Sequence, residues 1–450
     1  MDFALPTVYL ANDGLEIHVF VMVDYWLGKE GRLMTTVSLR RGAIVVTDPP
    51  SGLKDELTYW KRELVYDEKK HRREMGGHYE SLFVEDGNRL ITMPGFGHRV
   101  LSTLRKLGNP YTLIDDRSPM PKPDMDKAFQ GLYDYQLEPV GTMLASGGGI
   151  LSAATGFGKT VMAAAMIRAF DPEQLKLRGT PTVVFAAPDK DINYKNWQSL
   201  TKLLPDREVG LVMSGYRKFT DDVQVITLDS LHLINPSDVG ILIVDEAHNA
   251  ASAERADSIS KFTNAIRWGV SATPTGRFDG GDLVLEGLLG PVVCTRTYQD
   301  AVKLGALVPI EVYWVKAPEP KVGITYYNEY KTRDAKIRAA IINNHAYSKL
   351  VADLMKSIPD SRSTLCFTQW INQMANIHAM CPELAYVHAQ TKEGVGTIGP
   401  VSTKKRKEIY DRMSDGEIRK IFATHCWKQG WHHQPLLVLS ITHGTKRKIP

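Results

Sequence analysis

The chain has 450 residues, of which 43% are hydrophobic and 24% are charged. This length predicts two or three domains, with enough apolar residues for real cores. No apolar run reaches 18 residues, and no basic and apolar leader begins at Met1, so the sequence predicts neither a transmembrane helix nor a signal peptide. The four cysteines form no CxxC pair, which argues against a disulfide framework or a zinc ribbon and fits a reducing, cytoplasmic location.

The formal net charge of +4 is unevenly distributed. Residues 401–450 hold 11 Lys and Arg against 4 Asp and Glu, a net charge of +7, so the first 400 residues are slightly acidic. A basic C-terminal part indicates a phosphate backbone nearby. A solvated helix face explains the run Lys404–Lys407 equally well.

Residues 1–116 predict a small α+β domain. The sequence indicates a helix at 99–106, a hairpin that pairs 81–84 with 89–92, and strands at 16–23, 43–47 and 111–114. A polar stretch with three prolines follows, so we assign 117–128 to a linker. The basic cluster Lys69–Arg73 makes DNA recognition a hypothesis for this domain, and a solubilising or protein-contact role is the alternative.

Apolar runs typical of buried strands alternate with helical segments between residues 129 and 306. The first helix is expected at 159–170, and the expected strands are 149–154, 182–187, 223–228, 240–244 and 265–270. This order predicts a doubly wound parallel sheet with its ligand at the carboxyl ends of the strands.

The first of these strands runs into a glycine-rich loop, Thr155-Gly156-Phe157-Gly158, followed by Lys159 and Thr160. Glycines let backbone N–H groups turn inward around phosphate oxygens. We therefore expect a nucleoside triphosphate, with Lys159 at the β- and γ-phosphates and the Thr160 hydroxyl on Mg²⁺. The usual pattern has glycine where Ala153 stands.

A second block, Asp245-Glu246-Ala247-His248, follows the apolar run 240–244. At the carboxyl end of that strand, Asp245 can bind Mg²⁺ and Glu246 can activate the attacking water. Together with the loop, the block predicts that Lys159, Asp245 and Glu246 form the catalytic set.

A second α/β unit is expected from 307 to 450. Its predicted helix covers 346–357, and its predicted strands are 364–367, 386–388, 420–423 and 436–440.

Further motifs resemble those of superfamily-two helicases of the DEAH type. The run Ser271-Ala272-Thr273-Pro274 resembles their third motif, and residues 268–280 resemble its longer form in the XPB and UvsW branch. Gln136, 23 positions before Lys159, resembles the glutamine that reads adenine. The resemblance implies that His248, Ser271 and Thr273 couple the phosphate site to the DNA contacts.

The nucleic-acid motifs of the same family have counterparts in both units. Trp197 and Thr227 lie in segments that resemble the backbone-binding motifs of the first lobe, while Thr368, Gln369, Thr424 and Gly430 lie in those of the second. The resemblance spans roughly 129–450. It implies two RecA-like domains in tandem, 129–306 for ATP binding and 307–450 as the C-terminal lobe, with ATP–Mg²⁺ between them.

The N-terminal layout is similar to that of UvsW-type phage helicases, which implies a phage protein in the host cytoplasm. One departure concerns the sixth motif, Gln-x-x-Gly-Arg-x-x-Arg, because the sequence stops at Pro450 before such a block. Its arginines normally reach the γ-phosphate. We expect a truncated or weakly coupled motor, an arginine supplied by a partner protein or second chain, or Arg447 in this role.

The sequence therefore predicts an ATP-dependent DNA helicase or translocase that unwinds or branch-migrates forked and junction DNA in replication or recombination, with no membrane partner. One alternative is an RNA helicase. Another is an ATP-binding nucleic-acid-binding module with little hydrolysis, and a third is a double-stranded DNA translocase of a restriction or defence system.

Overall fold

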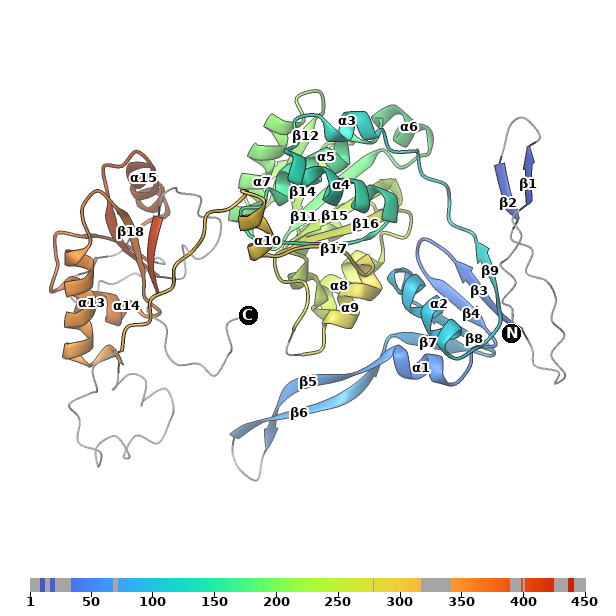
Figure 1. Cartoon of the computed structure of the whole chain (residues 1–450), viewed down its shortest axis with the longest axis horizontal. Helices are drawn as coiled ribbons and strands as arrows, with labels where there is room; N and C mark the ends of the chain where they lie inside the picture. Colours follow the sequence, from blue (N-terminus) through green and yellow to red (C-terminus); the bar gives the residue numbers. More distant parts are fainter. Residues whose placement is uncertain are drawn as a thin grey trace. The chain divides into compact units, whose positions relative to one another are not determined.

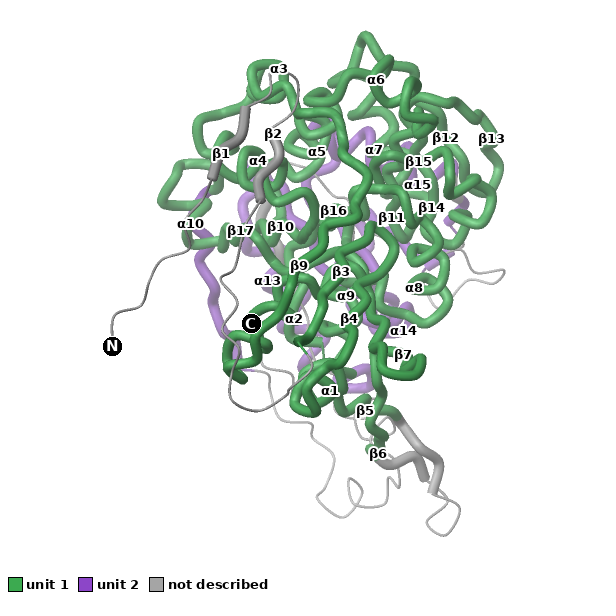
Figure 2. Tube along the Cα trace, turned by 90° about the vertical axis from the view of Figure 1, so that its right-hand side faces the viewer, with its two compact units in different colours: residues 1–307 green, residues 308–450 purple. Residues whose placement is uncertain are grey.

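A computed structural model describes residues 9–12, 17–20, 34–67, 72–277, 279–316, 341–388, 398–399, 401–424 and 436–440. The chain divides into two compact units, Met1–Leu307 and Val308–Pro450, which Figure 2 distinguishes by colour.

The first unit is built on an eight-stranded sheet with the order β13-β12-β14-β11-β15-β16-β10-β17. Seven strands are parallel, and β13 pairs antiparallel with β12 at one edge. The strands are β10 (Gly149–Ala153), β11 (Thr182–Ala187), β12 (Val209–Met213), β13 (Tyr216–Lys218), β14 (Val223–Thr227), β15 (Val239–Asp245), β16 (Ile266–Ser271) and β17 (Val292–Arg296). Every residue of the central strands β11, β15 and β16 is buried, as expected for parallel strands covered on both faces. The predicted α/β parallel sheet is confirmed.

Helices cover both faces of this sheet (Figure 1). One face packs against α3 (Met125–Phe129), α4 (Asp134–Ser146), α5 (Lys159–Arg168) and α7 (Lys190–Leu203), which share one apolar core. On the other face lie α8 (Ala253–Ser260), α9 (Asp282–Leu289) and the 3₁₀ turn η4 (Ala247–Ala251). Shorter elements complete this part: α6 (Pro172–Leu177), α10 (Tyr298–Lys303), η2 (Leu228–Leu233) and η3 (Pro236–Asp238). Helix α3 begins inside the stretch 117–128 that we assigned to a linker.

The N-terminal part carries a five-stranded sheet with the order β7-β8-β4-β3-β9. Its elements are β3 (Thr35–Leu39), β4 (Ile44–Thr47), α1 (Gly52–Glu56), β7 (Phe83–Asp86), β8 (Arg89–Thr92), η1 (Pro94–Phe96), α2 (Gly97–Lys106) and β9 (Tyr111–Asp115). The predicted hairpin is the antiparallel pair β7–β8. Strands β1 (Tyr9–Asn12) and β2 (Ile17–Phe20) form a separate antiparallel pair.

The N-terminal sheet shares a hydrophobic core with the eight-stranded sheet. Val46, Phe96 and Leu104 belong to the same buried cluster as Val244 and Leu285. Because the two parts exclude water from one continuous interface, the N-terminal part is a fixed cover on one face of the large sheet.

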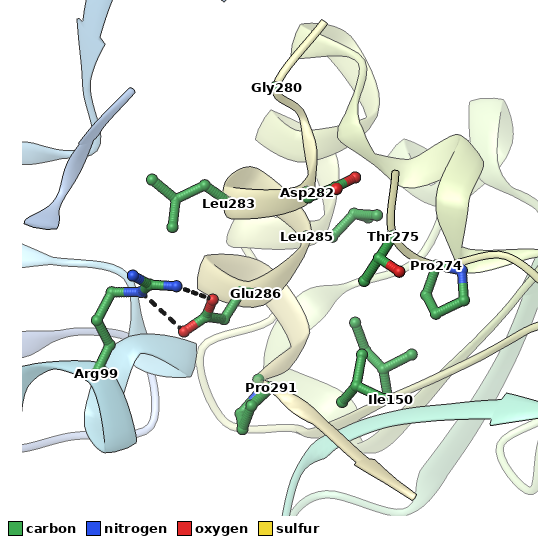
Figure 3. Close-up of a pocket in the computed structure, with 12 residues that line it drawn as sticks. Arg99, Ile150, Pro274, Thr275, Gly280, Asp282, Leu283, Leu285, Glu286 and Pro291 are labelled. Carbon is green, nitrogen blue, oxygen red and sulfur yellow. Dashed lines mark hydrogen bonds and ion pairs between the residues drawn. The ribbon is translucent and has the colours of Figure 1, made fainter. Parts of the chain in front are cut away.

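Backbone contact and an ion pair join η1 and α2 to α9. A Cβ at Gly95 would lie 1.9 Å from the carbonyl oxygen of Glu286, so only glycine fits there. The Arg99 guanidinium donates through Nε and Nη2 to the two carboxylate oxygens of Glu286, at 3.0 and 2.5 Å. Figure 3 shows this pair at the edge of a cavity of about 330 Å³, whose lining includes Ile150, Pro274 and Thr275. This cavity adjoins the segment after Ser271.

A long two-stranded ribbon belongs to neither sheet. Strands β5 (Thr58–Asp67) and β6 (Arg72–Ser81) pair antiparallel over ten residues each, and Figure 1 shows them extending from the N-terminal sheet. The sequence analysis did not predict this ribbon.

The second unit contains a parallel sheet with the order β19-β20-β18-β21. Its described elements are α13 (His345–Ser357), β18 (Ser363–Phe367), α14 (Ile371–His378), β19 (Ala385–Val387), α15 (Thr403–Ser414), β20 (Lys420–Ala423) and β21 (Leu436–Ser440). Two apolar clusters flank the sheet, one formed with α13 and α14 and the other with α15.

We predict that Gly95→Ala destabilises the protein, whereas Gly97→Ala changes its stability little. The new methyl group at position 95 meets a backbone carbonyl, while at position 97 the nearest side-chain atoms lie 3.9 Å away. Overpacking of this kind typically costs about 1–3 kcal/mol. Urea unfolding of the two variants measures the difference, and equal midpoints would contradict the proposed close approach.

Candidate functional site

The glycine-rich loop connects β10 to α5 with two residues in the left-handed region. Gly156 has φ +88° and Gly158 has φ +90°. A Cβ at Gly158 would lie 2.3 Å from Nε2 of Gln136, so the position has neither the conformation nor the space for another residue. Thr155 and Gly156 are exposed, while Phe157 is fully buried and fixes the loop from below. The loop thus exposes backbone N–H groups at the start of α5, an arrangement that suits phosphate.

Lys159 is the first residue of α5, and its ammonium group reaches back to the end of β10. Its Nζ donates to the carbonyl oxygen of Ala153 at 3.2 Å. A single carbonyl satisfies one of the three ammonium donors, so the others can serve phosphate oxygens.

Thr160, Asn196 and Asp245 form a hydrogen-bonded chain beside the loop. The Thr160 hydroxyl donates to Oδ1 of Asn196 at 3.4 Å, and Nδ2 of Asn196 donates to Oδ2 of Asp245 at 2.9 Å. The structure therefore brings together the two residues that the sequence predicted for Mg²⁺. A hydroxyl and a carboxylate are oxygen donors of the kind that Mg²⁺ takes together with phosphates, so the residues fit the metal.

The Asp245 carboxylate ends the central strand β15 and is only 7% exposed. Burial raises its pKa, and the neighbouring charge of Glu246 adds to the effect, against hydrogen bonds from Asn196 and from the Glu246 backbone N–H. A carboxylate that lacks water in this way gains most from a cation, which supports its assignment as a metal ligand.

Glu246 adopts a left-handed backbone conformation with φ +47°, one of two such non-glycine residues in the described chain. Such a conformation costs about 1–3 kcal/mol, which the surrounding structure must offset. The turn separates the direction of the Glu246 side chain from that of Asp245, and its Oε2 lies 3.4 Å from Nδ1 of His248. Asp245 and Glu246 thus have different neighbours, Asn196 for the first and His248 for the second.

His248 connects the acidic pair to the end of the neighbouring strand β16. Its Nδ1 lies 3.0 Å from Oγ of Ser271, and Ser271 accepts a hydrogen bond from the backbone N–H of Thr273 at 3.2 Å. Burial lowers the pKa of His248, and the charge of Arg277 lowers it further. The neutral ring can therefore both donate and accept within this network.

Arg277 extends the network away from the phosphate loop. It donates to the backbone oxygen of His248, and through Nε and Nη2 it donates to the carboxylate of Asp279 at 3.0 and 2.6 Å. The loop 275–281 is thus attached to the DEAH segment.

Gln136 is buried and supports the loop. Its Nε2 donates to the carbonyl oxygen of Phe157 at 3.2 Å, and its Oε1 accepts from the backbone N–H of Tyr133 at 3.2 Å. These contacts use the side chain to hold the phosphate loop, and adenine reading by Gln136 stays a prediction.

Trp197 and Thr227, the two first-lobe residues predicted to contact the nucleic-acid backbone, lie in different surroundings. The indole of Trp197 packs against the core and donates to the carbonyl oxygen of Val209 at 3.1 Å. Thr227 ends β14 and donates to Oγ of Ser230 at 2.7 Å. Trp197 thus has a packing role in the structure, and DNA contact by either residue stays a prediction.

In the second unit, three predicted residues lie at the carboxyl edge of the sheet. Thr368 follows β18 and Thr424 follows β20, and these strands are parallel neighbours. Gln369, next to Thr368, is exposed. Gly430 and Arg447 lie outside the described residues.

Two residues of the site were missed as site residues by the sequence analysis. Asn196 directly precedes Trp197 in a predicted nucleic-acid motif, and Arg277 lies within the longer motif 268–280, but neither was predicted as a site residue. The packing of α7 over the sheet brings Asn196 to Asp245 at the end of β15, and neither spacing nor residue type shows that contact.

Comparisons with known proteins agree with this geometry. Residues 131–276 match the family model described as the res subunit of type III restriction enzymes. Over 355 residues the chain is 24% identical to the DNA 3'-5' translocase XPB2 of Sulfurisphaera tokodaii. The aligned region covers 71% of this chain and 76% of the relative. A protein of Sulfolobus islandicus filamentous virus named as a helicase (helicase 22) is 28% identical over 195 residues, covering 40% of this chain. Residues 131–276 therefore form a domain similar to that res subunit, within a chain similar to proteins named as helicases and translocases.

Other helicases match over different parts of the chain. The present chain spans about a third of the filamentous-virus helicase, 34% of its length. A protein of Acanthamoeba polyphaga mimivirus named as an ATP-dependent RNA helicase (L396) is 24% identical over 357 residues, with 74% of this chain and 64% of the relative covered. Among solved structures, T4 UvsW matches with a TM-score of 0.45 and 15% identity, covering 90% of this chain and 83% of that chain. Among the residues that the structure describes, no helix is long and apolar enough to cross a membrane.

We predict that Asn196→Ala weakens Mg²⁺-dependent nucleotide binding. The change removes the group that orients Asp245, and the loss of such a supporting partner typically costs about 10- to 100-fold in metal affinity. Titration of a fluorescent ATP analogue with Mg²⁺ measures the effect, and the same titration in EDTA is the control. Equal weakening in both conditions would mean that Asn196 supports the loop and not the metal ligand.

The raised pKa of Asp245 predicts a pH-dependent cost to folding. A buried carboxyl favours the folded state only when protonated, so its cost is absent below the ordinary aspartate pKa of about 3.9 and grows as the pH rises toward the folded-state value. The stability of Asp245→Asn relative to the parent should therefore increase from pH 4 to pH 8 in EDTA, measured by urea unfolding.

Asp229→Asn is the matched control, because the hydrogen bond from Arg255 lowers the pKa of Asp229. The stability of Asp229→Asn relative to the parent should decrease as the pH rises toward and through the ordinary aspartate pKa of about 3.9, because the paired carboxylate of the parent stabilises the folded state once it is ionised. A flat difference for Asp245→Asn would show that its carboxyl is not the source of the cost.

Proposed function

We propose that the protein is an ATP-dependent DNA helicase or translocase that acts on forked and junction DNA. The observation that carries the proposal is the chain Thr160–Asn196–Asp245 beside the glycine-rich loop, with Glu246 turned aside by its left-handed backbone. This is a binding site for a magnesium-bound triphosphate with a second carboxylate free for water.

The loop and α5 would hold the phosphates. Backbone N–H groups of Gly156 and Gly158 bind phosphate oxygens, and Lys159 neutralises charge on the β- and γ-phosphates. The Thr160 hydroxyl and Asp245 would hold Mg²⁺, which neutralises the charge that develops during phosphoryl transfer.

Glu246 orients the attacking water and takes its proton. Its Oε2 is already near His248, so the protonated carboxyl can hydrogen-bond with the neutral imidazole ring. His248 contacts Ser271, and Ser271 holds Thr273, so a change at the phosphate end reaches the segment that follows β16. Residues Thr227, Thr368, Gln369 and Thr424 are proposed contacts for the nucleic-acid backbone.

DNA is the proposed substrate because a DNA translocase is among the relatives that align over most of both chains. The relative named as an RNA helicase makes RNA the second candidate. Strand separation on matched DNA and RNA forks decides between them.

The proposed function predicts that Glu246→Gln binds ATP but turns it over about 10²–10⁴-fold more slowly, because the substitution keeps the shape and removes the base. Lys159→Ala should also abolish turnover, while DNA binding is nearly unchanged. DNA-stimulated phosphate release measures both. Glu254→Gln, an exposed glutamate on α8, is the matched control and should behave as the parent. Parent-like turnover in Lys159→Ala would contradict the assignment of the site.

A further inference from the structure

The ribbon β5–β6 extends from the N-terminal sheet without joining any larger sheet among the described residues. Ten paired residues span about 33 Å at the usual rise of a strand. Its root is fixed, since Leu57 and Leu82 are buried and the N–H of Leu82 donates to the carbonyl oxygen of Leu57 at 2.9 Å. A two-stranded ribbon has little stability of its own in water, so a long one indicates a role in contact with something else.

The two faces of the ribbon differ in chemistry. On one face, described polar side chains pair with one another: Lys61 pairs with Glu80 at 2.6 Å, and Nδ1 of His78 lies 3.3 Å from Oε1 of Glu63.

The opposite face presents exposed aromatic rings. Trp60 and Tyr79 are directly paired across the strands, with ring centroids 5.0 Å apart and an angle of 74° between the rings. Trp60 is 45% exposed and Tyr79 is 74% exposed. Gly77 makes room for the indole, because a Cβ at that position would lie 2.7 Å from Nε1 of Trp60. Met75, on the same face, is 49% exposed.

The half of the ribbon next to its root contacts the loop 275–281, and Arg277 attaches this loop to the DEAH segment. The backbone N–H of Arg62 donates to the carbonyl oxygen of Asp279 at 3.4 Å. A Cβ at Gly280 would lie 2.7 Å from the ring of Tyr59, so this glycine packs directly against the ribbon. Arg277 joins the same loop to His248. A displacement of the DEAH segment can thus reach the ribbon through one hydrogen-bonded loop.

We propose that the face of the ribbon formed by Trp60, Tyr79 and Met75 stacks on the bases at the junction of a nucleic-acid duplex with its single strands. Aromatic rings bind bases by stacking, whatever the sequence, and this suits an element at a fork. In the sequence, the stretch Lys69–Arg73 holds four cations and one histidine, which favours a polyanion over an apolar protein surface. The inference rests on the proposed function for its substrate class.

The test uses the full chain, without nucleotide, and a DNA fork with 2-aminopurine at the junction. The parent should change the fluorescence of the probe, and Trp60→Ala/Tyr79→Ala should lose that change and bind the fork about 10- to 100-fold more weakly. Its affinity for a single strand should fall less. Phe219→Ala, which removes an exposed aromatic ring elsewhere, is the matched control.

Trp60→Phe/Tyr79→Phe keeps the rings and should restore both signals, which separates stacking from a folding defect. Unchanged fork affinity and fluorescence in the double alanine variant would overturn the proposal, as would a parent that leaves the probe unchanged. Lys159→Ala should retain the junction signal. A parent that hydrolyses no ATP therefore refutes the proposed function while the ribbon is still judged by its own readout. The same forks made of RNA show which nucleic acid the face prefers.

Discussion

The burial of the Asp245 carboxylate at the end of the central strand is the constraint on which the site depends. A charged group with 7% exposure must be compensated, and Asn196 and the backbone N–H of Glu246 supply part of that compensation. Asn196 in turn holds Thr160 at the start of α5. Helix α7, which carries Asn196, therefore connects the start of α5 to the carboxylate at the end of β15.

The same strand end sets the separation of the two acidic residues. If Glu246 continued the extended conformation of β15, its side chain would alternate to the other face of the sheet. The left-handed turn instead places it beside His248, where the network of Ser271 and Arg277 begins. The strained backbone of Glu246 thus lets its carboxylate contact His248, which in turn contacts Ser271 at the end of β16.

The sequence was sufficient to predict the parallel sheet, because β11 and β15 are continuous apolar runs. It also predicted the loop before α5, because the glycines before Lys159 indicate a tight turn, and Gly156 and Gly158 do have positive φ angles. It could not predict Asn196 in the site, since that contact arises from packing of α7 over the sheet. The ribbon was also missed. Its described side chains are exposed or half-exposed, and Trp60, Lys61 and Arg62 follow one another without the apolar alternation that identifies a half-buried strand. Gly95 carries no signal in the sequence for the carbonyl it approaches.

The shared core of the N-terminal sheet and the motor has a consequence for how this protein can be divided. Residues such as Val184, Leu242 and Val244 face the same cluster as Val37 and Leu90. A motor expressed without its N-terminal cover would display that apolar surface to water and would tend to aggregate. The two parts can therefore neither be dissected as independent modules nor exchanged between relatives unless both surfaces change together.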